Sequence, residues 1–586
     1  MRNLLIALAC CVPANVSAQE AVGPRAGFQT SSLQDVGPWG AAALPEGVAP
    51  LPSDLWRGAN PATLALLFAK ISPDQRFPSL QSLTRQAIFS GGAAPTTDPD
   101  IARARFEAAS RFGPAEAAAR LVFGVPRLAS QPDLAAIAVD AGLRVGRIDE
   151  ACNLIEAVTG PPQDTAWLES RATCYALNNE GAAANLSVDL AKTRGLTDTW
   201  LSRAIAAVAA PLTAPPPFRI DSGRALALSL KAKLKVPVTM AANPDPAALS
   251  ALMSTPDFMA ALSPEERVML AQNGAVRGVV SLDALMRYRP APDPAIVLPP
   301  VPAQIVQKLM LASSLAARAL EARMAIGDLK MVMQVQPGLI TLSEVPILTE
   351  AALWAGEGAL AASIANLSPE ALDPRLALVL ALYDPSKQAQ IIEQRIHAAG
   401  ADPVAQRIAV RDALMAWSAG LPVGGEVSLL IQAGLPSGPA GNASLRAALD
   451  LAASRGSKGE VILLTALALQ GTDPGSSDPE TLSSALKALR RGGLPVAARD
   501  LARDYLLATY VTLPQRAIAR PRAGSPNRER SRTAPVAAPP AVRTPAAPIE
   551  QMIPTEKSMP RPSARQNSPP ALATTPPRIK PSWGTP

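Results

Sequence analysis

Proline is the residue that most constrains how this chain can fold, because it occurs throughout the sequence, 60 times in 586 residues. Proline has no backbone N–H and clashes with the preceding helical turn, so it ends a helix or occupies the first turn of a new one. The spacing of the prolines therefore predicts many short helices rather than a few long ones.

Several prolines stand in a pattern that is typical of helix starts. Ser-Pro followed by acidic residues occurs at Ser72, Ser263 and Ser368, and Asp478-Pro479-Glu480 is a variant of the same pattern. The Ser or Asp side chain can accept a hydrogen bond from an unpaired amide as the N-cap, and proline fits the first helical position. The acidic residues then lie near the positive end of the helix dipole. We expect a helix to begin at each of these four places.

The composition favours helices that pack closely. Hydrophobic residues make up 48% of the chain but aromatic residues only 4%, so most apolar side chains are Ala, Leu and Val. Such small and medium side chains suit helix–helix packing. No segment keeps the apolar–polar alternation of a strand beyond a few residues. The sequence therefore predicts an all-α fold.

The first residues, MRNLLIALACCVPANVSAQE, have the features of an export signal. Arg2 gives a positive start, an apolar stretch follows, and small residues end at Ala18. We expect a signal peptide over residues 1–18, with cleavage between Ala18 and Gln19. No later apolar run reaches the roughly 18 residues of a membrane-spanning helix. The protein is expected to be periplasmic. Secretion, or a lipoprotein anchored at Cys10 or Cys11, is the alternative.

The positive charge of the chain belongs to its C-terminal tail. Residues 511–586 contain 12 Lys and Arg residues against 3 acidic ones, and 17 of these 76 residues are proline. The rest of the chain is nearly neutral, with 43 basic and 45 acidic residues. We therefore expect no nucleic-acid partner and a disordered tail. The tail is either a solvated linker or an arm that touches anionic lipid, glycan or an acidic protein.

Proline-rich breaks divide the sequence into segments. After the signal peptide, residues 19–52 are expected to form an extended lead-in. A helical-repeat domain over 53–211 and a short helical segment over 212–302, bounded by Pro-rich linkers, should follow. A second helical-repeat domain is expected over 303–510, before the tail of residues 511–586.

One stretch carries the spacing of a helical repeat. Small Ala172, Ala184 and Ala191, large Tyr175 and apolar Val188 fall at the positions that a 34-residue helical hairpin requires, and the sequence NNEG at 178–181 is the expected turn. A looser version of this spacing occurs one repeat earlier. Residues 131–198 thus resemble tetratricopeptide-like repeats. The resemblance implies an irregular α-solenoid of helical hairpins, which the disordered Pro-rich C-terminal tail expected from the composition would follow.

Cys152 and Cys174 would lie on adjacent helices of neighbouring hairpins in such a solenoid. In an oxidising compartment this placement favours a disulfide, and two buried thiols are the alternative. A catalytic thiol would require an activating base. The sole histidine, His397, is far away in the sequence and is expected near a helix C-terminus, one turn before Gly400.

An enzyme must also be considered, because soluble lytic transglycosylases combine a periplasmic helical superhelix with a catalytic glutamate domain. The most similar sequence here, EERVMLAQNGAVRGVVSL at 265–282, contains Gly274-Ala275 and Gly278. It lacks the Glu-Ser and Leu-Met-Gln elements of that family's signature. The sequence contains no phosphate-binding loop, dinucleotide fingerprint, HExxH or paired CxxC motif. No catalytic residue, cofactor or metal site is predicted.

These features together predict a non-enzymatic exported scaffold or adaptor that binds protein partners in the bacterial cell envelope. A motility, division or envelope-assembly complex would suit such a scaffold. The alternatives are a cell-wall (peptidoglycan) enzyme or its regulator, and a secreted structural protein.

Overall fold

The structure is a computed structural model that describes residues 37–44, 48–159, 164–236, 245–289, 300–384, 390–433 and 443–510. Within these residues it contains 26 α-helices and no β-strand, so the predicted all-α fold is confirmed. The predicted signal peptide with its cleavage site at Ala18 and Gln19, and the predicted tail over 511–586, lie outside the described residues.

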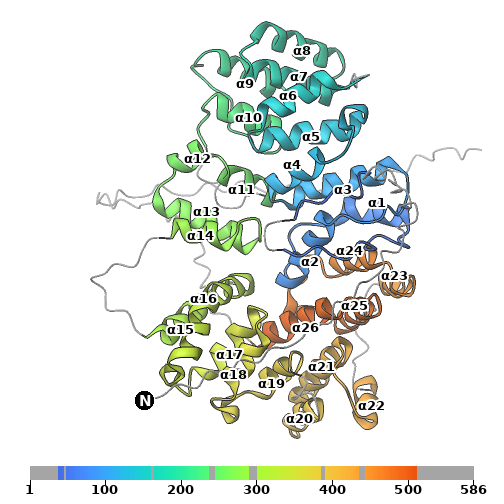
Figure 1. Ribbon diagram of the computed structural model, residues 1–586, viewed down its shortest axis with the longest axis vertical. Helices are drawn as coiled ribbons and strands as arrows, with labels where there is room; N and C mark the ends of the chain where they lie inside the picture. The colour runs from blue at the N-terminus through green and yellow to red at the C-terminus, as the bar shows by residue number, and fades with distance from the viewer. Residues whose placement is uncertain are drawn as a thin grey trace, which may run out of the picture. The chain divides into compact units, whose positions relative to one another are not determined.

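The N-terminal helices continue into a group at the top of Figure 1, where the chain doubles back. Helices α5 and α6, and helices α7 and α8, pack as consecutive pairs, and α10 returns to contact both α5 and α7. The elements are α1 (Pro61–Lys70), α2 (Pro78–Phe89), α3 (Pro99–Phe112), α4 (Ala115–Phe123), the 3-10 turn η1 (Leu128–Ser130), α5 (Pro132–Arg144), α6 (Ile148–Ala157), α7 (Thr165–Leu177), α8 (Gly181–Thr193), α9 (Trp200–Ala209) and α10 (Gly223–Lys231).

Four shorter helices follow. Of these, α11 packs on α3 and α4, and α13 contacts the long helix α16. They are α11 (Pro246–Met253), α12 (Pro256–Ala261), α13 (Pro264–Val276) and α14 (Leu282–Tyr288).

The remaining helices again pack largely as pairs, such as α15 with α16 and α17 with α18. They are α15 (Val301–Leu311), α16 (Leu315–Val335), η3 (Pro337–Leu339), α17 (Val345–Trp354), α18 (Gly358–Ala365), η4 (Pro369–Ala371), α19 (Pro374–Ala381), α20 (Ile391–His397), α21 (Pro403–Ala419), α22 (Gly425–Ala433), α23 (Ala443–Ser454), α24 (Lys458–Ala468), η6 (Pro474–Ser476), α25 (Pro479–Arg491) and α26 (Pro495–Tyr510).

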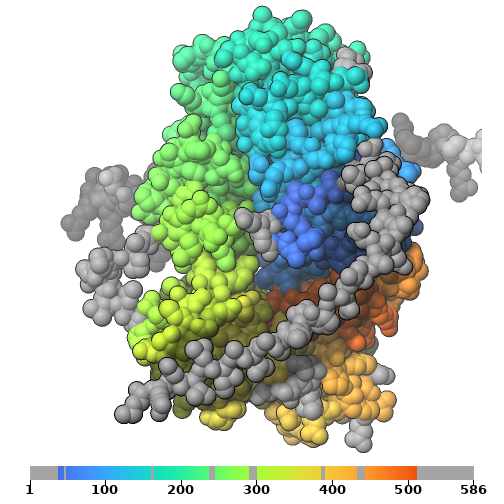
Figure 2. Space-filling model, viewed as in Figure 1, coloured from blue at the N-terminus to red at the C-terminus, as the bar shows by residue number. Residues whose placement is uncertain are grey.

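The first and last helices contact each other. Helix α1 packs on α24, and α2 packs on α24 and α26, as the blue and orange-red helices of Figure 1 and Figure 2 show. The Gly459 amide donates to the Leu55 carbonyl at 2.8 Å, and the Ser79 amide donates to Asp504 Oδ2 at 2.7 Å. Segments about 400 residues apart therefore share one hydrophobic core.

The described residues all belong to one compact unit. The boundary expected at residue 211 falls after α9, and the one expected at residue 302 falls within the first turn of α15. Helices on both sides of the first boundary contact each other, since α10 packs on α5 and α7. Whether the expected segments fold on their own stays a prediction.

Part of the expected extended lead-in is packed against the core. Residues 37–44 form no helix, yet Trp39 is buried. Its ring lies 5.6 Å from that of Trp56 and 6.3 Å from that of Phe68. Burial of several large aromatic rings stabilises this junction.

The expected helix starts have mixed outcomes. Ser263 begins α13 with a complete capping box that includes Glu266, and Asp478 caps α25. No helix begins at Ser72, because its hydroxyl accepts the Asp74 amide within a local turn and the next helix starts at Pro78. At Ser368 only a 3-10 turn forms, and the hydroxyl donates to the Glu370 carboxylate rather than capping an amide. The Ser-Pro-acid pattern therefore marks turns as well as helices.

Candidate functional site

The structure brings the two predicted cysteines together. Cys152 on α6 and Cys174 on α7 form a disulfide, with their Cα atoms 5.5 Å apart. Both residues are buried. The bond links the second helix of one hairpin to the first helix of the next, which is the placement expected from the sequence. His397 is the last residue of α20, and Gly400 beyond it has a left-handed backbone with φ +60°.

The helical-repeat hairpin has the expected internal structure. Helix α7 ends at Leu177 and α8 begins at Gly181, so the predicted turn over 178–181 is confirmed. Ala172, Ala184 and Ala191 are completely buried where the helices approach. Small side chains at these points allow the close packing that the repeat spacing implied.

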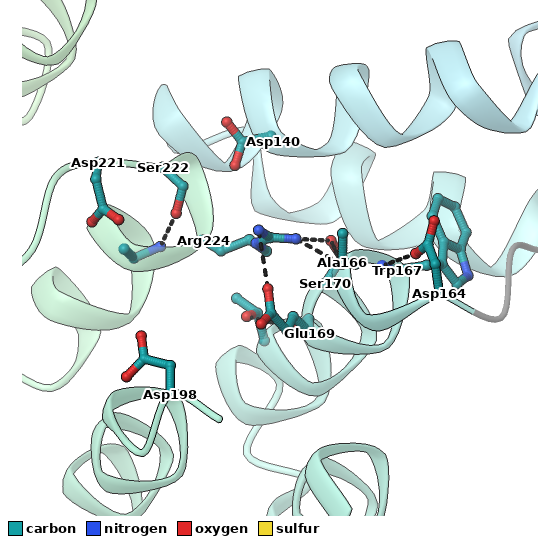
Figure 3. A network of polar contacts seen from close by, with 12 residues as sticks. Asp140, Asp164, Ala166, Trp167, Glu169, Ser170, Asp198, Asp221, Ser222 and Arg224 are labelled. Carbon is teal, nitrogen blue, oxygen red and sulfur yellow. Dashed lines mark hydrogen bonds and ion pairs between the residues drawn. The ribbon is translucent and has the colours of Figure 1, made fainter. Parts of the chain in front are cut away.

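A polar network holds α10 against α7 (Figure 3). The Arg224 guanidinium on α10 donates to the Ala166 carbonyl at 2.6 Å and to Ser170 Oγ at 3.2 Å. It also pairs with the Glu169 carboxylate at 3.1 Å. Every charged group in this contact has a partner, so the network is suited to positioning a helix rather than to holding a ligand.

Helix α10 is also held against α5. The Gly223 amide donates to Asp140 Oδ1 at 2.8 Å. A Cβ at Gly223 would collide with the Asp140 carbonyl oxygen, so only glycine permits this close approach. These contacts link α10 to both α5 and α7 where the chain doubles back.

The same corner contains an exposed ion-pair cluster. Arg219 contacts Asp198 and Asp221, each at 2.5 Å. The hydrogen bond from Arg219 lowers the pKa of Asp221. The pKa of Asp198 is lowered mainly by the hydrogen bond from the Trp200 amide and further by the hydrogen bond from Arg219. The Arg219 guanidinium also lies 5.1 Å from the Trp200 ring.

Arg105 is a completely buried arginine that no carboxylate neutralises among its described contacts. Burial lowers its pKa to about 9. The guanidinium instead donates to five backbone carbonyl oxygens at 2.8–3.3 Å, those of Ile88, Pro38, Trp39, Ala41 and Ser90. This side chain ties residues 38–41 to α2 and α3, which gives it a structural role.

Arg318 is buried as well, but it has a carboxylate partner. Its guanidinium forms a two-bond pair with Glu350, at 2.6 and 2.8 Å, and donates to the Leu309 carbonyl at 2.7 Å. The Trp354 indole N–H donates to the same carboxylate at 2.9 Å. This cluster joins α15, α16 and α17 and leaves no charge free.

A groove with a volume of about 650 Å³ lies where α2 meets α16, α17 and α26. A second cavity of about 350 Å³ continues along α2 toward α13 and α14. Pro78, Ser82, Gln86 and Arg323 line both cavities. We call the two together the arginine groove, because Arg323, Arg499 and Arg503 line the first cavity and Arg85 and Arg323 line the second.

Arg503 is the neutralised arginine of the groove. It pairs with Asp504 at 2.8 Å and Asp500 at 3.3 Å. Burial alone would lower the pKa of Arg503, but Asp504, Tyr383 and Asp500 outweigh this effect and raise it. Burial raises the pKa of the Tyr383 phenol, which donates to Asp500 at 2.6 Å.

Within the described part of the chain, the hydrogen bonds of Arg85 and Arg323 go to backbone carbonyl oxygens and not to carboxylates. Arg85 is buried and donates to the carbonyls of Gly113, at 3.2 Å, and Arg277, at 2.6 Å. Burial and the charge of Arg323 lower the pKa of Arg85 to about 10. Arg323 is exposed at the mouth of the groove, yet loss of water between the groove walls and the charge of Arg503 lower its pKa.

The described helices include none that is long and apolar enough to cross a membrane. Among the described residues, no group of three or more His, Cys, Asp or Glu side chains is placed to hold a metal ion. No protein-family model matches the sequence, and neither curated proteins nor solved structures yielded a match.

Sequence reasoning missed the arginine groove. Its four arginines come from α2, α16 and α26, and each arginine taken alone resembles an ordinary solvated charge on a helix. One sequence feature could have pointed to Arg323: no Asp or Glu stands three or four positions from it to pair with its charge. That signal is weak, because it occurs on many exposed helices.

Proposed function

We propose that this chain is an exported, non-enzymatic scaffold that binds protein partners in the bacterial cell envelope. The observation that carries the proposal is the arginine groove, which is open to solvent and formed by helices from both ends of the described chain. Concave surfaces between packed helices are a common way in which helical-repeat proteins bind their partners.

The disulfide between Cys152 and Cys174 supports export, because disulfides persist in oxidising compartments such as the periplasm. The basic tail supports a second, weaker contact. Its excess of positive charge would attract an acidic protein, glycan or anionic lipid at low salt, and this attraction would weaken as salt rises.

Site-specific photo-crosslinking in intact cells tests the scaffold proposal. A crosslinking amino acid at Ser82, which is exposed on the groove wall, should capture a defined envelope protein. The same amino acid at Arg407, exposed on α21 outside the groove, is the control. If neither position captures a protein in any growth condition, the chain does not act as a scaffold.

A further inference from the structure

The arginine groove contains more positive than negative charge. Four arginines line it, and Asp500 is the one acidic residue among its lining residues. Asp504 lies behind the wall, where it is buried and already paired with Arg503 and the Ser79 amide. An anion entering the groove would therefore meet unneutralised guanidinium groups, above all Arg323.

The backbone at Gly278 helps to hold Arg85 beside the second cavity. Gly278, at φ +67°, packs directly against the guanidinium of Arg85. A Cβ at this position would lie 2.5 Å from Arg85 Nη1, so glycine allows the arginine to reach the Arg277 carbonyl. Arg85 is thus held in the wall of the second cavity, where the charge of Arg323 acts on it. Close like charges of this kind are stabilised by a shared anion.

The groove also contains unused hydrogen-bonding groups. Ser79 Oγ and Arg499 Nε are buried and have no hydrogen-bond partner among the described residues. Both residues line the first cavity. A buried polar atom without a partner costs free energy, so a ligand that rearranges these side chains and bonds to them would be favoured.

The walls between these polar groups are apolar. Trp354, Leu489, Leu494 and Leu501 line the first cavity. Ser82 and Gln86 on α2 form a polar edge along both cavities. Alternating apolar and hydrogen-bonding surface suits an extended peptide, whose backbone and side chains need both.

We propose that the arginine groove binds an acidic peptide segment of a partner protein, with Arg323 and Arg499 contacting its carboxylates. This proposal rests on the proposed scaffold function and names the chemistry of the partner. The tail of this chain does not provide the segment, because residues 511–586 are strongly basic. An anionic lipid fits less well, because its acyl chains would offer no hydrogen-bond partner to the buried Ser79 hydroxyl.

Binding of a fluorescent oligoglutamate peptide to the full-length protein tests this proposal. Because the basic tail also attracts the peptide, the decisive quantity is the difference between two matched variants. Arg323→Glu should weaken binding at least about ten-fold, since it removes one attractive charge and adds a repulsive one. Arg407→Glu changes the net charge equally and should leave binding close to that of the wild type.

Chemical modification of arginines gives a local readout. Phenylglyoxal reacts with accessible arginines, and mass spectrometry of the digested protein reports each site. Oligoglutamate should slow modification of Arg323 and Arg499 but not of Arg407. An oligoglutamine peptide of equal length should protect none of the three residues.

Three results would overturn the proposal. In the first, Arg323→Glu and Arg407→Glu bind oligoglutamate equally. In the second, inorganic phosphate protects Arg323 as well as the peptide does, which would indicate a site for simple anions. In the third, only vesicles containing anionic phospholipid protect Arg323, which would indicate a lipid site. If the peptide binds in the groove but Ser82 captures no protein in cells, the scaffold proposal fails and the groove chemistry stands.

Discussion

At the scale of single residues, three arginines differ in how their charge is accommodated. Arg318 is buried with a carboxylate partner in Glu350, and Arg105 is buried with only carbonyl oxygens as partners. Arg323 is exposed, and its Nε donates to the Ala319 carbonyl at 3.4 Å. Buried charges are costly unless they are paired or hydrogen-bonded. The first two arginines therefore have structural roles, and the third is the one available to a ligand.

Arg105→Ala should destabilise the protein strongly. The substitution removes five hydrogen bonds and leaves several carbonyl oxygens buried without a donor. We expect a loss of about 3 kcal/mol or more in the free energy of unfolding. Urea unfolding followed by circular dichroism measures it.

Arg103→Ala on the same helix is the matched control. Arg103 is exposed and lies 3.9 Å from Asp100 and 3.8 Å from Glu107. Exposed pairs of this kind contribute about 0–1 kcal/mol. Equal midpoints for the two variants would show that Arg105 does not hold residues 38–41 in place.

At the scale of helices, local patterns in the sequence predicted much of the structure. The turn before α8 and the buried alanines followed from repeat spacing, and Ser263 and Asp478 do begin helices. Ser72 and Ser368 show the limit of the pattern. Side-chain contacts that sequence spacing alone does not reveal turn the same residues into loops.

The disulfide should stabilise the pairing of α6 with α7. Replacing Cys152 and Cys174 together by Ala should lower the free energy of unfolding by about 3 kcal/mol without loss of helical content. Thermal unfolding of the two proteins measures the difference. Two reactive thiols in the unreduced, unfolded wild type would contradict the bond itself.

At the scale of the whole molecule, the closure of the first helices on the last was not predictable from the sequence. Nothing in α1 or α2 identifies α24 or α26 as their partners, because the contacts form between apolar surfaces about 400 residues apart. The arginine groove depends on this closure, since α2 forms one of its walls and α26 another. The arginine groove was therefore missed as well, because its walls come together only through contacts between segments far apart in the sequence.

Gly459→Ala tests the closure. Gly459, in the first turn of α24, lies so close to the Trp56 ring that an added Cβ would collide with it. We expect a loss of about 1–3 kcal/mol, typical of overpacking. Urea unfolding gives the difference.

Gly327→Ala is the control for this substitution. Gly327 lies within α16 with no atom near its missing Cβ, so alanine should stabilise the helix by about 0.5–1 kcal/mol. A neutral or stabilising effect at Gly459 would indicate that α24 does not pack tightly on Trp56.

The most direct test of the whole account is the yield of crosslinked partner at Ser82 in living cells, measured in the background of a charge reversal. With Arg323→Glu the yield should fall to background, because the groove would repel the acidic segment that it is proposed to bind. With Arg407→Glu the yield should match that of the otherwise unaltered protein. Equal capture of the same partner in both backgrounds would contradict the assignment of the arginine groove as the binding site.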